Sequence, residues 1–391
     1  MLPLRYFSNR ILAQHIQIRY DFTMLVYFAL SVATLIPLVF LFVVRKLDKF
    51  GTNKFVYNIL NLACGGLAYF LAAQINPAII HSGLASRNEV VRVLAPVLEE
   101  VLKSLFLIYL IQRADFNFIV DGVIYGFGAG IGFAIFENWE YVTGHPTIAL
   151  SVALARVFST NLIHATSSGI ISAGLAYRRS DLSWKGWAII FFGYLFSIGF
   201  HIAFNTMVSL GTLLAFAVLF GAIGAAIIWY IIRRGLNLQK LWVAEKLGVA
   251  DRATKQETKV VSNIDAINEI LSPVEQRFGV EKASLVRNLI YKQAEIGIKR
   301  KLMDTTSSAN KGNEINEIIE GLVQDTNDLR NQIGVYCMMF VRTVYLEQDI
   351  QIWNLLNARV AAAGLGQKGG GLWDRVNTRM KDSHNPQEEQ L

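Results

Sequence analysis

The stretch APVLEEVLKSLF, residues 95–106, decides how this sequence is interpreted, because it places Glu99, Glu100 and Lys103 inside an apolar run. A charge near the centre of a bilayer costs about 2.5–3.5 kcal/mol on insertion scales, and such residues usually face a protein interior or a water-filled cavity. An internal ion pair would use one glutamate and the lysine. Burial of the second, unpaired glutamate in the membrane would still cost free energy, so we interpret the stretch as part of a functional cavity.

The composition separates the chain into a membrane part and a soluble part. Only 17% of all residues are charged, against about 25% in ordinary soluble domains. The first 239 residues carry 17 Lys and Arg against 10 Asp and Glu, and the rest carries 20 of each. The net charge of +7 therefore belongs to the membrane part, where it indicates topology rather than nucleic-acid binding.

Seven segments are apolar over the roughly 20 residues that a spanning helix needs. They are residues 22–44, 55–76, 90–112, 118–141, 148–177, 186–209 and 211–232. The sequence therefore predicts an all-α fold: a polytopic membrane helix bundle of about seven transmembrane helices with a C-terminal soluble helical domain. We divide the chain into an N-terminal tail (1–21), a membrane domain (22–235, with a motif core at 90–210), a soluble helical domain (240–362) and a disordered tail (363–391).

The short loops indicate how the bundle is oriented. Basic residues cluster after the first, fifth and seventh spans, at 45–54, 178–185 and 233–234, whereas the loops 77–89 and 142–147 carry only Arg87. Lys and Arg are enriched in cytoplasmic loops. We therefore expect a multi-pass protein of a bacterial plasma membrane with its C-terminal domain in the cytoplasm. Three arginines in the N-terminal tail oppose this orientation.

Three further spans carry ionisable residues beside polar ones. Phe133 to Asn138 (FAIFEN) places Glu137 late in the fourth span, after four glycines at spacings that let helices approach closely. His164 stands in the fifth span, and His201 with Asn205 one turn later in the sixth. A single histidine in a helix is more often a packing residue than a ligand, and Arg156 is either a counter-ion for a carboxylate or a residue reaching to the membrane surface.

The depth of these residues makes them more informative as a set. With alternating helix directions and a rise of about 1.5 Å per residue, Glu99, Glu100, Glu137, His164 and His201 all fall between the outer half and the middle of the bilayer. Four helices can therefore meet at one polar cavity.

The ordered series of motifs resembles the PrsW family of intramembrane proteases, which is related to the CAAX-prenyl-protease and bacteriocin-processing superfamily. The series consists of EExxK at 99–103, FxxxEN at 133–138, HATSS at 164–168 and HxxxN at 201–205. The resemblance covers residues 90–210 and implies an intramembrane endopeptidase that cleaves membrane-anchored protein substrates, such as an anti-sigma-factor-like regulator. No counterpart is identified for the soluble domain, whose partner is unknown.

Two mechanisms suit the residue types. In the first, which we favour slightly, Glu99 or Glu100 activates water as a general base, Lys103 tunes the pair, and His164 or His201 donates to the developing oxyanion. In the second, Glu137, His164 and His201 hold a zinc ion and the paired glutamates act as base. Phe133, Asn138 and Asn205 are expected to support the cavity.

Two hypotheses from other functional classes compete with the protease hypothesis. A transporter would use buried charges as an ion or proton relay, but it predicts repeated broken helices, and no second copy of the glutamate motif is found. A non-catalytic scaffold of the same fold would not need the complete acid–base set. We therefore predict a hydrolase whose partners are a membrane-anchored protein and the lipid bilayer, with no nucleic acid.

Overall fold

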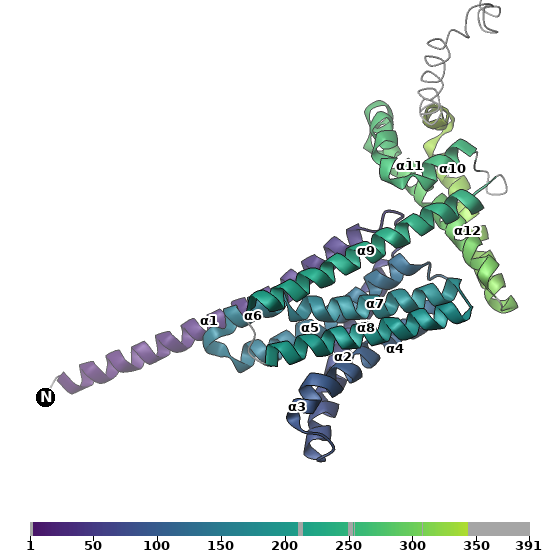
Figure 1. The fold of residues 1–391 in the computed structure, drawn as a ribbon. Helices are drawn as coiled ribbons and strands as arrows, with labels where there is room; N and C mark the ends of the chain where they lie inside the picture. The colour runs from purple at the N-terminus through teal and green to yellow at the C-terminus, as the bar shows by residue number, and fades with distance from the viewer. Residues whose placement is uncertain (1–2, 210–213, 249–252, 254, 307, 343–391) are drawn as a thin grey trace, which may run out of the picture.

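The computed structural model describes residues 3–209, 214–248, 253, 255–306 and 308–342, and side chains only from residue 23 onward. Over these residues the chain is helical and contains no strand, which confirms the predicted all-α membrane bundle with additional C-terminal helices (Figure 1). Part of the predicted domain 240–362 and the whole predicted tail 363–391 lie outside the described residues. The domain boundaries stay predictions.

The elements follow one another as α-helices joined by short turns. In order they are α1 (Pro3–Lys46), α2 (Phe55–His81), α3 (Arg87–Glu89), the π-helical η1 (Val90–Leu94), α4 (Ala95–Ile111), α5 (Ile119–Gly144), the 3₁₀ turn η2 (Pro146–Ile148), α6 (Ala149–Val157), α7 (Thr160–Ser180), α8 (Trp184–Ser209), α9 (Leu214–Lys246), α10 (Lys255–Ser262), the 3₁₀ turn η4 (Ile264–Ala266), α11 (Ile267–Thr305) and α12 (Ala309–Ile333).

Six helical stretches in the described part of the chain are long and apolar enough to cross a membrane, and they correspond to six of the seven predicted spans. The other predicted span, 90–112, consists of η1 and the 17-residue α4, which buries Glu99, Glu100 and Lys103. The predicted span 148–177 is divided into α6 and α7 by a break at Phe158 and Ser159. This break fixes the position of Arg156 in the last turn of α6.

The central helix of the bundle is α5, which is buried over almost its entire length. Its glycines lie directly against neighbouring backbones. A Cβ atom on Gly130 would overlap the backbone of His164 and Ala165 in α7, and one on Gly132 would overlap the carbonyl group of Leu62 in α2. The predicted close approach of helices at the glycine run is therefore found on two faces of α5.

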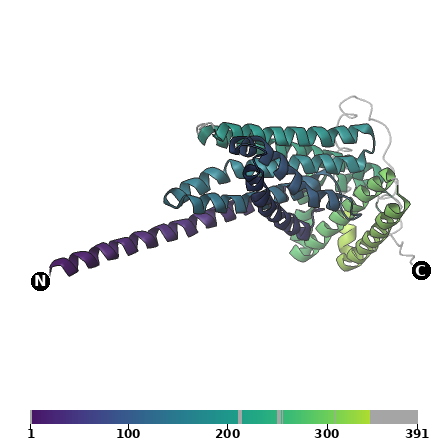
Figure 2. The same cartoon turned by 90° about the horizontal axis from the view of Figure 1, so that it is seen from below.

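The C-terminal helices pack against one end of the bundle, opposite the N-terminal end of α1 (Figures 1 and 2). α9 runs without a break from the membrane span into this part, and Phe50 and Val243 belong to its apolar core. The buried Lys299 of α11 donates to the carbonyl oxygens of Ala114 (2.6 Å) and Phe116 (3.2 Å) in the α4–α5 loop. The C-terminal helices therefore meet the end of the bundle that carries the basic loops.

Candidate active site

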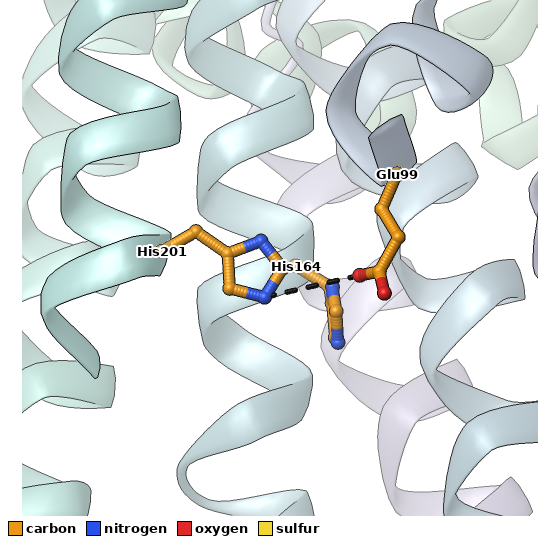
Figure 3. A group of neighbouring side chains, drawn as sticks. All are labelled: Glu99, His164 and His201. Atoms are coloured by element: carbon orange, nitrogen blue, oxygen red, sulfur yellow. Dashed lines mark ion pairs between the residues drawn. The ribbon is translucent and has the colours of Figure 1, made fainter. Parts of the chain in front are cut away.

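Four helices bring the predicted ionisable residues together in the interior of the bundle. Glu99, Glu100 and Lys103 come from α4, Glu137 from α5, His164 from α7 and His201 from α8. Glu100, Lys103 and both histidines are at most 1% exposed, and Glu99 is 9% exposed. Figure 3 shows the side chains of Glu99, His164 and His201 converging from three helices.

Glu100 is the glutamate that Lys103 neutralises. Its Oε1 atom lies 2.6 Å from the Lys103 ammonium and 3.0 Å from Nδ1 of His201, and its Oε2 atom accepts a 3.4 Å hydrogen bond from the Ser168 hydroxyl. An ionised carboxylate can only accept hydrogen bonds, so Nδ1 of His201 carries the proton. Glu100 is therefore held as a paired anion that orients His201.

His164 stands between a cation and an anion. Lys103 lies 3.0 Å from Nδ1, and Glu137 lies 2.8 Å from Nε2. Because an ammonium group can only donate, Nδ1 accepts from Lys103, and Nε2 then donates to Glu137. The rings of His164 and His201 are 4.7 Å apart and nearly perpendicular, so the two imidazoles share one cavity.

Glu137 is paired with Arg156, which the sequence left as either a counter-ion or a surface residue. The guanidinium lies 2.7 Å from the Glu137 carboxylate, and its Nε atom donates a 2.8 Å hydrogen bond to Asn138. The same guanidinium stacks 3.8 Å from the ring centre of Tyr141. Arg156 reaches these groups because α6 ends just after it.

Glu99 makes no such close ion pair. Its Oε2 atom faces Nε2 of His201 at 3.9 Å. With Nδ1 of His201 hydrogen-bonded to Glu100, Nε2 is the ring nitrogen that faces Glu99, and 3.9 Å is too long for a hydrogen bond between the two groups. A water molecule or a cation between them would give both groups a close partner. This gap is the chemically open position of the cluster.

The donor set at this gap suits a zinc ion. One ligand atom each from Glu99, His164 and His201 lies within 4.8 Å of the others. Two imidazoles and one carboxylate are a set that catalytic zinc sites use, and bonds of about 2.0–2.1 Å would need these atoms to move closer together. His164 would also have to release Lys103 or Glu137. The zinc ligands predicted from the sequence were Glu137, His164 and His201. In the structure the Glu137 carboxylate already contacts Arg156 and His164, and Glu99 takes its place in the group.

The three predicted supporting residues have different positions. The Phe133 ring lies 4.9 Å from the His164 ring and 4.7 Å from the Lys103 ammonium, so it forms a wall of the cluster. Asn138 is fully buried and holds Arg156. Asn205 donates a hydrogen bond to the carbonyl oxygen of Val91 (3.1 Å) in η1. It fastens α8 to the π-helical turn that precedes α4.

Sequence reasoning missed Ser168 as a contact of Glu100. The signal was present, because HATSS places Ser168 one turn after His164 and therefore on the same helix face. A polar residue one turn from a buried histidine is a candidate partner in a membrane interior.

Comparison with protein families agrees with this geometry. Residues 56–232 match the family model described as PrsW family intramembrane metalloprotease. Over these residues the chain is similar to the PrsW family. The matched range contains all six members of the charged cluster and ends inside α9, so the C-terminal helices lie beyond it. Neither the search of curated proteins nor the search of solved structures found a match.

The match to the PrsW family model gives the coarse function. The protein has the spanning helices of an integral multi-pass membrane protein, and the matched family is one of intramembrane peptidases. Such an enzyme acts on membrane proteins within the bilayer. The family description also names a metal, in line with the Glu99, His164 and His201 group.

Proposed function

We propose that this protein is an endopeptidase that cleaves membrane-anchored protein substrates at the cluster of Glu99, His164 and His201. The observation that carries the proposal is the open position between Glu99 and His201 beside fully paired charges. Peptide hydrolysis needs an activated water molecule and stabilisation of the negative charge that develops on the carbonyl oxygen. The cluster offers both kinds of group in one buried place.

The residues divide into two roles in this proposal. Glu99 and Nε2 of His201 contact the reacting water, because no hydrogen bond joins them across their 3.9 Å separation. Glu100 and Lys103 orient the imidazoles of His201 and His164. Arg156 keeps Glu137 ionised and in place beside His164.

A metal-assisted reaction is the form we favour, because the donor set fits and the family description names it. A zinc ion held by Glu99, His164 and His201 would polarise the scissile carbonyl group and make the attacking water more acidic. In the alternative glutamic form, Glu99 alone removes the proton from water. Both forms use the same side chains, so a chelator distinguishes them.

The substrate is expected to be a single-span regulator of the anti-sigma-factor type. The cluster lies nearer the end of the bundle that is opposite the C-terminal helices: Glu137 stands seven residues before the end of α5 at Gly144, about 10 Å at 1.5 Å per residue. In the orientation that the loops predict, with the C-terminal helices in the cytoplasm, this is the outer half of a bacterial plasma membrane.

The proposal is tested with purified protein and a panel of single-span membrane substrates. Glu99→Gln and His201→Ala are expected to lower cleavage at least about 100-fold, since acid–base groups contribute 10²–10⁴-fold. Glu140→Gln is the matched control, because Glu140 is exposed at the end of α5 and accepts a hydrogen bond from Tyr69. Equal cleavage by all variants would reject the catalytic assignment of Glu99 and His201, and no cleavage in any sample would favour a non-catalytic scaffold.

A chelator experiment decides the form of the reaction. Wild-type protein is treated with 1,10-phenanthroline or with its non-chelating 1,7 isomer, and cleavage is measured before and after zinc is restored. Loss with the first compound alone, reversed by zinc, supports the metal form. Full activity in both samples supports the glutamic form.

A further inference from the structure

A cavity of about 610 Å³ lies at the junction of the membrane bundle and the C-terminal helices. Its walls come from the end of α4, the end of α7, the first half of α8 and the turn between α11 and α12. This end of the bundle is the one that carries the basic loops, away from the Glu99 cluster. The cavity therefore has no part in the proposed reaction.

The inner wall of this junction cavity is apolar. Ile108, Leu175, Leu182, Trp187 and Ile190 line it, and Leu182 and Trp187 are 47% and 62% exposed. Tryptophan is enriched where a membrane span meets the interface. A hydrocarbon chain entering from the bilayer would find an apolar surface there.

The remaining wall is cationic. Arg178 and Arg179 stand in the last turn of α7, and Lys311 in the first turn of α12, while none of the described residues lining the cavity is acidic. Of the acidic groups near the cavity, Asp115 pairs with Lys54 and Arg113, Asp181 accepts hydrogen bonds from Ser183, and Glu314 lies close enough to Lys311 to influence it. The three cations therefore share a cavity whose own lining contains no acidic side chain.

The cations also have unused hydrogen-bonding capacity. Arg179 uses its Nη1 atom to cap α4 by donating to the carbonyl oxygens of Ile111 and Arg113, but its Nη2 atom is buried without a hydrogen-bond partner. The buried Nε atom of Arg178 also has none. Donors of this kind are costly to bury unless an acceptor arrives.

Two further features favour an anion at this place. Burial and the positive charge of Arg179 lower the pKa of Lys311, against the opposing influence of Glu314, so an anion beside these cations would be favourable. α12 begins at Ala309 without a side-chain cap, so its N-terminal N–H groups add partial positive charge beside Ser308 and Lys311.

We propose that this junction cavity binds an anionic phospholipid, with its phosphate at Arg178, Arg179 and Lys311 and its acyl chain along Ile108, Trp187 and Ile190. Arginine pairs with phosphate through two parallel hydrogen bonds, and basic pockets between membrane helices are suited to acidic head groups. The apolar wall distinguishes a lipid from a free phosphate. The bound lipid would join the C-terminal helices to the membrane bundle.

The test is native mass spectrometry of the full-length, detergent-solubilised protein. The protein is titrated with phosphatidylglycerol, with phosphatidylcholine of the same acyl chains, and with inorganic phosphate. Wild type is expected to bind one phosphatidylglycerol more tightly than the other two compounds. Equal binding of both lipids would overturn the anion assignment, and phosphate binding as tight as phosphatidylglycerol would overturn the lipid assignment.

Variants locate the site. The double variant Arg178→Gln with Lys311→Gln is expected to bind phosphatidylglycerol about 10- to 30-fold more weakly, from about 1 kcal/mol per basic residue. Arg45→Gln with Lys46→Gln is the matched control, because it removes one arginine and one lysine at the end of α1 and keeps the cavity. An equal loss in both double variants would show general surface attraction and reject the site.

A second variant keeps the test decisive if the first one folds poorly. Gln112→Glu adds an acidic group to the cavity wall and leaves every cation in place. It is expected to weaken phosphatidylglycerol binding and to leave phosphatidylcholine binding unchanged. Wild-type affinity for phosphatidylglycerol in this variant would contradict the proposal.

Discussion

At the scale of single residues, the cluster consists of alternating acids and bases in which nearly every charge has a partner. Lys103 is central, because it contacts both Glu100 and His164. Removing one member of a buried ion pair leaves an uncompensated charge and typically costs about 3–5 kcal/mol, whereas removing both members costs much less. The cluster therefore has a strict internal charge balance.

Lys103→Met is accordingly expected to lower the free energy of unfolding by about 3–5 kcal/mol. The reason is that Glu100 would lose the ammonium group 2.6 Å away while remaining fully buried. Thermal unfolding in detergent measures the change. The double variant Lys103→Met with Glu100→Gln should recover much of the loss, and a double variant as unstable as the single one would show that Lys103 acts through packing alone.

The gathering of these residues in the interior of the bundle was predictable from the sequence, but the contacts between them were not. Helical spacing placed Glu99, Glu100 and Lys103 on adjacent faces of one helix, and charge in an apolar span marked them as interior residues. Which glutamate Lys103 contacts depends on how α4 is rotated against α7 and α8. That rotation follows from packing between helices distant in sequence, so it could not be derived from spacing.

At the scale of elements, α5 is the helix against which the site is assembled. Gly130 lies against the backbone of His164, so the separation of α5 and α7 sets the distance between Glu137 and His164. The sequence indicated close packing at the glycines but did not show which helix each glycine contacts. It also did not reveal the break between α6 and α7, because residues 148–177 are apolar enough on average for one long span and contain no proline.

Gly130→Ala is expected to lower stability by about 1–3 kcal/mol, the usual cost of overpacking, and to reduce cleavage by separating Glu137 from His164. Unfolding in detergent and the cleavage assay measure the two effects. Gly144→Ala is the control, because a Cβ atom there meets nothing within 4 Å. Similar behaviour of the two variants would mean that helix propensity, rather than the contact with α7, controls the result.

At the scale of the whole molecule, the buried Lys299 joins the C-terminal helices to the loop between α4 and α5. Burial lowers its pKa from the ordinary value of 10.5 to about 7. Between these values the unfolded chain holds a proton that the folded protein has released. Stability therefore rises as the pH increases from about 7 to about 10.5, by at most about 1.4 kcal/mol per pH unit.

Hydrogen exchange of α11 at pH 7 and pH 9 tests this dependence after correction for the intrinsic exchange rates. The wild-type protein should be better protected at pH 9. Lys299→Met should remove the pH dependence, because no group titrates at that position. Lys301→Met is the control, since Lys301 is paired with Glu245 at the surface. A pH dependence that persists in Lys299→Met would assign it to another group.

The unbroken course of α9 has a mechanical consequence. Over 33 residues it measures about 50 Å at 1.5 Å per residue, with Val243 against Gly297 of α11 at one end and Gly224 against Thr166 of α7 further along. Thr166 is two residues from His164, so α9 connects the C-terminal helices to the helix that carries part of the proposed site. We expect a ligand of the C-terminal helices to change deuterium uptake in α7 as well as in α11. An effect confined to α11 and α12 would show that α9 does not transmit the change. A joint response would mean that a conformational change in the C-terminal helices reaches the helix of the buried His164 through α9.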